Sequence, residues 1–131
     1  MARENVDVVQ RHTEAFNRRD LTTWLALFRS DAEIDWSRAR GPQKGVYRGR
    51  RGHQAFWDVW LTFDWGEIET YDLAEAGSEV VVPNTTTFRG RQGIEVVARS
   101  AFVITVENSQ ITRYRLFQER AEALEAAGLS E

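Results

Sequence analysis

The stretch IEVVARSAFVITVE, residues 94–107, is a long and nearly unbroken apolar run that decides how the chain is organised. Valine, isoleucine, phenylalanine and threonine dominate it, and these side chains favour the pleated surface of a β-strand. Apolar residues stand on both faces of such a strand. We therefore expect both faces to be covered, one by helices and the other by a second subunit.

The segments around this run have the same character. Residues 66–75, 79–89 and 110–117 are rich in valine, isoleucine, threonine, phenylalanine and tyrosine. Short turn sequences such as Ala76-Gly77-Ser78 and Asn108-Ser109 join them, and links of that length require antiparallel neighbours. Pro83 cannot donate to a strand ladder, so we expect it at a bulge or at an unpaired edge position.

The first half of the chain has helical periodicity instead. Apolar residues recur at spacings of three and four in residues 4–17, 21–28 and 51–63, and a short strand is predicted at 32–36. Asp20 is a suitable N-cap for the second helix. Helices followed by a meander of strands predict an α+β domain, with the helices packed on one face of a curved antiparallel sheet.

The chain ends in a further helical segment. Residues 119–127 predict a last helix, which Gly128 would end as the residue after the C-cap. No linker or repeat interrupts the 131 residues, so residues 1–131 are predicted to form a single domain.

Composition excludes several classes of function. The net charge is −3, which argues against nucleic acid as a partner. The chain has no cysteine and only two histidines, which are separated in the sequence, so we expect no metal site and no cofactor. No apolar run is long enough to span a bilayer, and the N-terminus lacks a signal core. A cytoplasmic protein is expected.

Three segments together resemble the NTF2-like superfamily, and within it the SnoaL-like, polyketide cyclase-like branch. They are VVQRHTEAFNRRDLTTWLALFRSDAEIDW, GVYRGRRGHQAFWDVW and RYRLFQERAEALEAAGL, at 8–36, 45–60 and 113–129. The resemblance implies a cone-shaped fold, in which a strongly curved antiparallel sheet wraps around the N-terminal helices and leaves an internal cavity. It also implies a homodimer through the convex sheet face.

The same resemblance suggests catalytic residues. Ketosteroid isomerases of this fold carry a tyrosine on the first helix, and His12 stands at the matching position. Their proton-shuttling aspartate corresponds to Trp36 by strict count, with Asp35 one residue earlier. Their second acid falls near Arg99 or Ser100, neither of which is an acid, so steroid isomerisation is not predicted. A neutral imidazole and a carboxylate in an apolar cavity could nevertheless share proton transfer, which makes His12 and Asp35 the candidate catalytic pair.

Adjacent side chains of a strand point to opposite faces, so only one of Asp35 and Trp36 is expected to face the cavity. Aromatic residues could form its wall and Arg99 could anchor a ligand. The predicted ligand-binding residues are Phe16, Trp36, Trp57, Trp60, Arg99, Phe102 and Tyr114. The basic stretch 38–51 reads either as a solvated loop or as an anion-attracting rim, and His53 is expected to be exposed.

Fold alone does not settle function in this superfamily. The first hypothesis is a cofactor-free isomerase, cyclase or dehydratase that acts on an apolar carbonyl or polyketide-like substrate. The second is a non-catalytic binder of a small apolar molecule, and the third is a protein-interaction module. The sequence leaves open whether the protein is an enzyme.

Overall fold

The computed structural model describes residues 2–129, apart from the side chains at positions 2, 3 and 91. Its strands are β1 (Phe28–Trp36), β2 (Gly45–Arg48), β3 (Trp65–Thr70), β4 (Ala74–Ala76), β5 (Glu79–Arg89), β6 (Glu95–Glu107) and β7 (Gln110–Phe117). They form one curved, unclosed sheet in the order β2-β1-β7-β6-β5-β3, with β4 paired to β5. All neighbours are antiparallel except β1 and β7, which run parallel.

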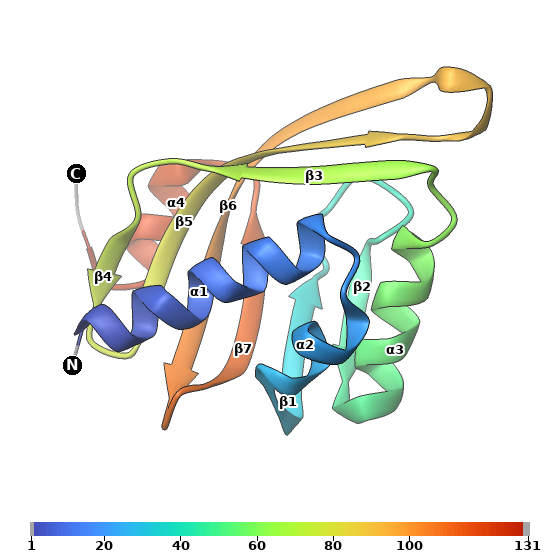
Figure 1. The fold of residues 1–131 in the computed structure, drawn as a ribbon. Coiled ribbons are helices and arrows are strands. Elements are labelled where there is room, and N and C mark those ends of the chain that lie inside the picture. Colours follow the sequence, from blue (N-terminus) through green and yellow to red (C-terminus); the bar gives the residue numbers. More distant parts are fainter. Residues whose placement is uncertain (1, 130–131) are drawn as a thin grey trace.

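Helices cover both faces of this sheet. They are α1 (Ala2–Asn17), α2 (Leu21–Ala26), α3 (Gly49–Trp60) and α4 (Arg120–Ala126), and a short 3₁₀ turn, η1 (Arg91–Gly93), joins β5 to β6. The first three lie on the concave side and α4 lies on the other side (Figure 1). The predicted α+β architecture is therefore confirmed. None of the described helices is long and apolar enough to cross a membrane.

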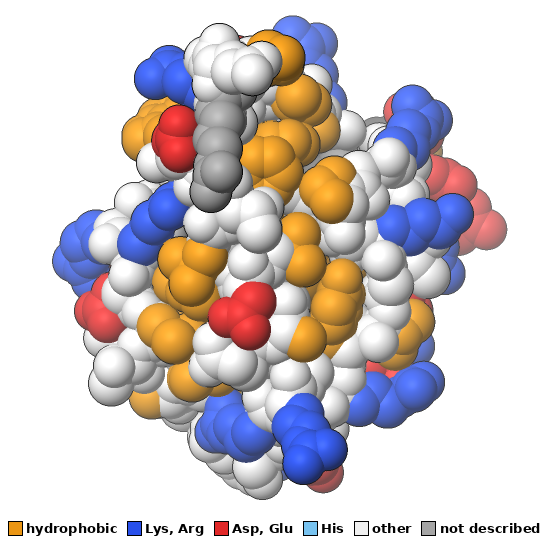
Figure 2. Space-filling model, turned by 90° about the vertical axis from the view of Figure 1, so that its right-hand side faces the viewer, with side chains coloured by type: hydrophobic (Ala, Val, Ile, Leu, Met, Phe, Trp, Pro, Cys, Tyr) orange, Lys and Arg blue, Asp and Glu red, His pale blue; other side chains and the backbone are white. Residues whose placement is uncertain are grey.

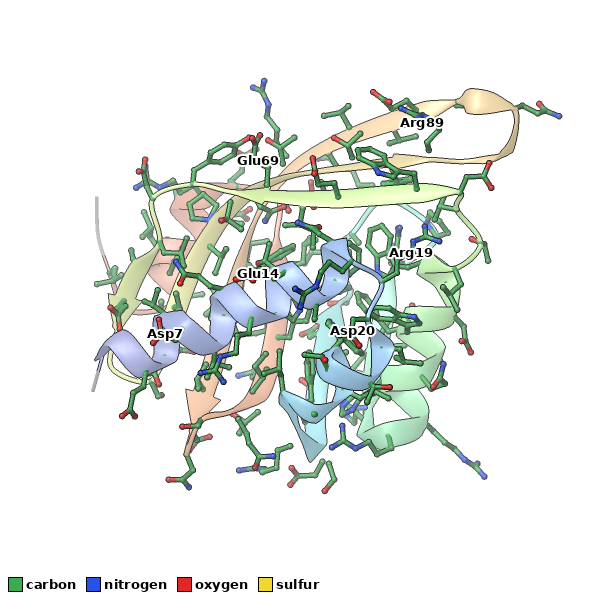
Figure 3. The ribbon with its side chains drawn as sticks, viewed as in Figure 1. Asp7, Glu14, Arg19, Asp20, Glu69 and Arg89 are labelled. Atoms are coloured by element: carbon green, nitrogen blue, oxygen red, sulfur yellow. The ribbon has the colours of Figure 1, made fainter. Side chains whose placement is uncertain are left out.

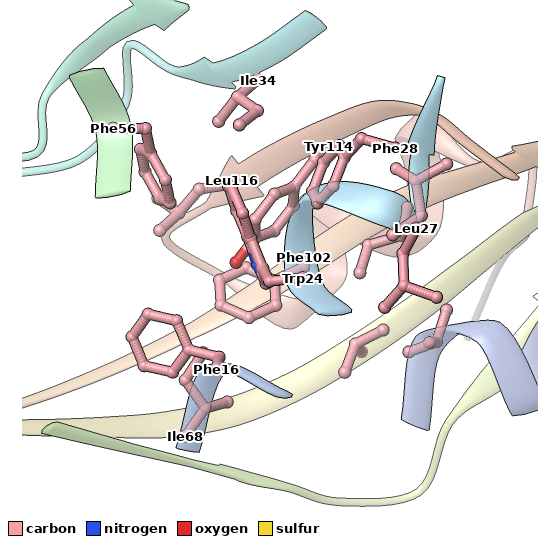
Figure 4. Close-up of a cluster of buried hydrophobic side chains, with 14 of the residues drawn as sticks. Phe16, Trp24, Leu27, Phe28, Ile34, Phe56, Ile68, Phe102, Tyr114 and Leu116 are labelled. Atoms are coloured by element: carbon pink, nitrogen blue, oxygen red, sulfur yellow. The ribbon is translucent and has the colours of Figure 1, made fainter. Parts of the chain in front are cut away.

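The concave side holds the main core, as the strand alternation requires. In β1, Ala32, Ile34 and Trp36 are buried, while Glu33 and Asp35 between them are only half-buried. Aromatic rings from α2, α3 and β7 fill the space between sheet and helices (Figure 4). Trp24 and Phe56, for example, stack with ring centroids 6.0 Å apart. Burial of so many large side chains on one face fixes which face of each strand points inward.

A second, smaller core lies on the convex side. Ala123 and Leu124 of α4 pack there with Val81, Ala101 and Val103. Both faces of β6 are thus covered near residue 101, but α4 supplies the outer cover where the sequence suggested a second subunit. Elsewhere this face carries ion pairs between strands, and Val46 and Val97 are exposed on it. The convex-face homodimer stays a prediction.

The bounds of several strands differ from the predictions, because short strands have too few residues to show a clear alternation. β1 begins at Phe28, four residues before the predicted strand. The sequence did not reveal this first part, because a bulge before Glu33 interrupts the alternation of buried and exposed residues. The predicted strand 66–75 is divided into β3 and β4 around Asp72, which has a φ of 39°. Only four residues long, β2 was not predicted.

Three local predictions are confirmed. Asp20 accepts a hydrogen bond from the Thr23 backbone N–H at 3.1 Å as the N-cap of α2. Gly128 follows the C-cap of α4 with a φ of +80°, which glycine adopts at little cost. Pro83 lies opposite the break between β3 and β4, where the ladder needs no N–H from it.

Candidate functional site

A pocket of about 350 Å³ opens on the concave side, between the loop after β1 and a hairpin arm. The arm, residues 85–99, is the part of β5 and β6 that extends beyond the end of β7, while β3 pairs with its β5 half (Figure 1). Trp36, Trp60, Phe88, Val96 and Leu116 supply most of the apolar wall. The volume lies within the range of about 300–1,000 Å³ that is usual for small-molecule sites.

Polar groups stand around this apolar wall. They belong to Arg40, Gln43, Thr86, Arg99, Ser100 and Gln118. No carboxylate and no imidazole is among the described lining residues, and two of these residues carry guanidinium groups. The hydroxyls of Thr86 and Ser100 already donate to Asn84, and the Gln118 amide donates to the Arg38 carbonyl. The polar part of the pocket therefore offers mainly the positive charge of its two arginines, which suits anions.

Three buried donors in pocket residues have no hydrogen-bond partner within the described chain. They are the indole Nε1 atoms of Trp36 and Trp60 and the side-chain amide Nε2 of Gln43. Leaving a buried donor unpaired costs roughly 1–3 kcal/mol, so such groups call for an explanation. These atoms are shielded from solvent, so an acceptor on a bound molecule could supply the missing partners only if the lining side chains shifted.

Arg19 fixes the position of one pocket wall. This residue follows the end of α1, and its guanidinium donates to the backbone carbonyls of Phe63 at 2.7 Å and Trp60 at 3.4 Å (Figure 3). These bonds tie the end of α1 to the end of α3, which carries Trp60. The indole of Trp60 also packs edge-on against Phe16 and Phe88, with centroids 4.8 and 5.7 Å away. Its orientation is thus well determined.

His12 lies in the aromatic core and does not line the pocket. The ring is only 1% exposed and packs edge-on against Tyr114, with centroids 4.8 Å apart, and near Phe28 and Trp24. Neither ring nitrogen has a partner among the described residues. Burial without a compensating hydrogen bond lowers the pKa of His12 to about 3, so the imidazole is neutral at ordinary pH.

Asp35 lies on the other face of β1. Its carboxylate accepts hydrogen bonds from the Ser37 backbone N–H at 3.1 Å and from the Ser37 hydroxyl at 2.6 Å, and lies 3.8 Å from the Arg38 guanidinium. Partial burial raises the pKa of Asp35, but the Ser37 bonds and the charge of Arg38 outweigh it and leave the pKa below its usual value. Asp35 is thus an ionised loop anchor.

The structure therefore does not bring His12 and Asp35 together. Trp36, and not Asp35, faces the concave side. A shared proton transfer between the two side chains stays a prediction without a contact to support it.

The predicted ligand residues separate into three groups. Trp36, Trp60 and Arg99 line the pocket. Phe16 and Trp57 border a gap of only about 10 Å³ beside Trp60, too small for a ligand. Phe102 and Tyr114 pack behind Trp36, with ring centroids 5.6 and 5.7 Å from its indole.

Sequence reasoning missed the most polar part of the pocket. Arg40 lay within the basic stretch that was considered as a rim, so composition could have indicated it. Gln43 and Thr86 gave no signal, because a single glutamine in a loop or threonine in a strand is common on any surface. Only the folded chain shows that both are buried.

Most of the basic stretch serves the structure. Arg38 lies over the Phe117 ring at 4.4 Å, Arg48 pairs with Glu33 at 2.8 Å, and Arg50 donates to two backbone carbonyls near the start of β1. His53 is fully buried, and its Nε2 lies 2.8 Å from the Ala32 carbonyl. The prediction that His53 is exposed is therefore wrong. Within residues 2–129, no cluster of three or more histidine, aspartate or glutamate side chains could hold a metal ion.

A match to a family model shows which protein family the chain belongs to. A family model described as the SnoaL-like domain matches residues 9–114. The chain belongs to the SnoaL-like family. Among curated protein sequences, none matches it.

Solved structures of similar fold agree with this assignment. TerC, co-crystallised with polyporic acid, superposes with a TM-score of 0.77 at 18% identity, over 95% of this chain and 98% of that one. An NTF2-like protein from Burkholderia xenovorans gives 0.74 at 25% identity, over 97% of each chain. Rv0760c from Mycobacterium tuberculosis, in complex with estradiol-17β-hemisuccinate, gives 0.77 at 16% identity, over 88% and 94%. The predicted NTF2-like fold of this SnoaL-like chain is confirmed.

Proposed function

We propose that this SnoaL-like protein binds a small, flat, largely apolar molecule that carries oxygen acceptors or a negative charge, in the pocket beside the hairpin arm. The observation that carries the proposal is the set of unpartnered donors, Trp36 Nε1, Trp60 Nε1 and Gln43 Nε2, in residues that line one aromatic pocket. Arg40 and Arg99 add positive charge to the same lining. Ligands of this description are bound by two similar folds, as polyporic acid and a steroid hemisuccinate.

The test is a binding measurement on a panel of planar hydroxyquinones and aromatic carboxylic acids, each paired with a hydrocarbon of the same shape. Quenching of tryptophan fluorescence reports binding directly, because two indoles line the pocket. The oxygen-bearing member of each pair should bind more tightly. Equal binding of both members would contradict the role of the donors.

Gln43 and Arg40 provide the decisive variants. Gln43→Leu removes one buried donor at similar volume and should weaken binding about fivefold, the worth of one hydrogen bond. Arg40→Ala should weaken the binding of anions more than that of neutral ligands. Lys44→Ala is the matched control, because Lys44 is a neighbouring cation of the same loop that does not line the pocket. Affinity that both Gln43→Leu and Arg40→Ala leave unchanged would overturn the proposal.

The acid–base enzyme is the second candidate, and one observation favours it. The neutral imidazole of His12 has both nitrogens without a partner in the described chain, so its one basic nitrogen could accept a hydrogen bond from a substrate that reached the core. Its pKa of about 3 makes it a weak base, so proton transfer would require a substrate whose binding raises that pKa. Asp35 supports it less, since its carboxylate is occupied by Ser37 and Arg38. Turnover of a carbonyl substrate that survives both His12→Leu and Asp35→Asn would exclude this pair as the catalysts.

A further inference from the structure

Two cavities of the molecule adjoin where β6 passes the end of β7. The inner cavity is the pocket of about 350 Å³ between the arm and the loop after β1. An outer cavity of about 400 Å³ lies on the convex side, between Thr85 of β5 and Glu119 before α4. Arg99, Ser100 and Gln118 line both cavities. These three residues therefore mark the place where a ligand could extend from one cavity into the other.

The strand edge at this junction is open. β6 pairs with β5 along residues 95–105, but its pairing with β7 begins only at Ala101. Residues 96–100 all line the inner cavity. Because successive side chains of a strand point to opposite faces, a cavity lined by consecutive residues borders the edge of the strand as well as its face. Across from this edge, the side-chain amide of Gln118 donates to the Arg38 carbonyl at 2.6 Å, which fixes the other side of the junction.

The main-chain groups at the open edge face the inner cavity. Alternate residues of an antiparallel strand direct their N–H and C=O groups to opposite sides. The Ile94 carbonyl accepts from the Gly90 N–H at 3.0 Å, on the β5 side, so the N–H groups of Val97 and Arg99 point to the open edge. Val96 and Val97 are 43% and 58% exposed, so solvent reaches this edge. Figure 2, which views the molecule from this end, shows hydrophobic side chains gathered in the upper part of the face.

Arg99 places a cation at the same junction. Strand alternation puts its side chain on the convex face, with Thr85 directly opposite on β5. Its guanidinium has no ion pair within the described chain. Arg89 of the same arm differs, because it pairs with Glu95 at 3.0 Å and lies over the Trp65 ring at 5.3 Å. A cation without a counter-ion, beside a main-chain N–H that no strand covers, suits a carboxylate.

The outer cavity is polar, whereas the inner one has an aromatic wall. Its lining includes the hydroxyl groups of Tyr71 and Thr85, which lie 2.8 Å apart, and the Arg120 guanidinium. The carboxylate in the described lining is that of Glu119, which accepts a hydrogen bond from the Glu122 backbone N–H in the capping box of α4. The outer cavity therefore suits an acidic group of a ligand, and the inner cavity suits an apolar ring system.

We propose that the ligand of this site is an amphipathic carboxylic acid, in which a flat apolar ring system carries a flexible chain that ends in the acid. The ring system lies in the inner cavity, and the chain crosses the open edge of β6 beside Gln118. The carboxylate accepts hydrogen bonds from the Arg99 guanidinium and from the Arg99 N–H at the edge. This inference rests on the proposed function, which places the ring system, and adds the chain and the position of its charge.

Naphthoquinone derivatives of different chain length test whether a ligand crosses the edge. The probes are naphthoquinone itself, its derivatives with a carboxymethyl or a carboxypentyl chain, and the primary amide of each acid. Binding is followed by quenching of tryptophan fluorescence. The carboxypentyl acid should bind about tenfold more tightly than its amide, which is the worth of a hydrogen bond between charged groups. A carboxymethyl group is shorter than the spacing of about 4.8 Å between neighbouring strands, so it cannot cross the edge.

Arg99→Gln is the decisive variant, because it removes the charge and keeps a long polar side chain. It should lower the affinity for the carboxypentyl acid to that for its amide. Thr85→Tyr should have the same effect, because the larger side chain fills the outer cavity and tyrosine suits a strand position. Arg89→Gln is the matched control, since Arg89 is a cation of the same arm that lines neither cavity. It should leave the difference between acid and amide intact.

The outcomes separate this inference from the proposed function. Equal binding of the carboxypentyl acid and its amide, or a difference that Arg99→Gln leaves intact, would overturn the inference, while binding of naphthoquinone would still support the proposed function. An equal loss of affinity in Arg89→Gln would also overturn the inference, because the effect would then come from the overall charge of the arm. Absence of binding by every probe would overturn both.

Discussion

Stability should fall in mild acid because of His12. In the folded protein its pKa is lowered to about 3, and in the unfolded chain it returns to 6.5. Between these values the unfolded state binds a proton that the folded state does not, so the free energy of unfolding decreases as the pH falls. At about pH 5 the loss relative to neutral pH is about 2 kcal/mol. It grows until the pH reaches the folded pKa.

The substitution His12→Leu isolates this contribution. Leucine has a similar volume and no buried nitrogen, so at neutral pH the variant should be at least as stable as the parent. Urea unfolding, followed by tryptophan fluorescence at about pH 5 and about pH 7.5, gives the free energy of unfolding of both proteins. The parent should lose about 2 kcal/mol more than the variant between these conditions. Other titrating groups, His53 included, are present in both proteins and cancel.

Two results would refute this reasoning. Parent and variant could lose the same free energy of unfolding in acid. That result would show that folding does not lower the pKa of His12. Alternatively, an NMR titration of the His12 ring protons could give a midpoint near the ordinary value of 6.5. Either result would mean that a polar group or water reaches the imidazole in solution, and that this part of the core is open.

Three further predictions concern single contacts, each checked by urea denaturation. His53→Leu should destabilise the fold by roughly 1–3 kcal/mol, because it leaves the buried Ala32 carbonyl of β1 without its donor. His12→Leu removes no such hydrogen bond. Asn17→Ala should cost a similar amount by freeing both backbone groups of Ile68, and light scattering should detect new self-association at the exposed β3 edge. Gly52→Ala should cost roughly 1–3 kcal/mol, since its Cβ would lie 2.7 Å from the Tyr47 carbonyl carbon.

The α+β class could be predicted because its signals are local and repeated, whereas the cone-shaped fold came from the family resemblance. Each long strand alternates or runs apolar over many residues, and Asp20 and Gly128 mark helix ends by their own chemistry. The short strand β2 could not be predicted. Its four residues form a strand only because β1 lies beside them, with Ile34 opposite Tyr47. Such pairing depends on the tertiary structure and leaves no period in the sequence.

The candidate site was harder to predict because distant segments build it. Gln43 and Thr86 meet at the pocket although 42 residues of chain lie between them. By contrast, the alternation of β1 was enough to predict that only one of Asp35 and Trp36 could face inward. In the structure, Ser37 and Arg38 contact the Asp35 carboxylate on the outer side of β1. The match in sequence position therefore identified the strand that borders the pocket. It did not identify the residue that faces the pocket, which is Trp36 and not the acidic Asp35.

The long strand β6 explains why one apolar run could not be assigned a single role. Around Phe102 its inner side chains join the main core, and around Val103 its outer side chains pack beneath α4. Toward Val96 the same residue types line the pocket and reach solvent. A globular chain has little reason to extend an apolar strand beyond its own core. The exposed end of β6 therefore serves the pocket and the surface, while its other end serves the two cores.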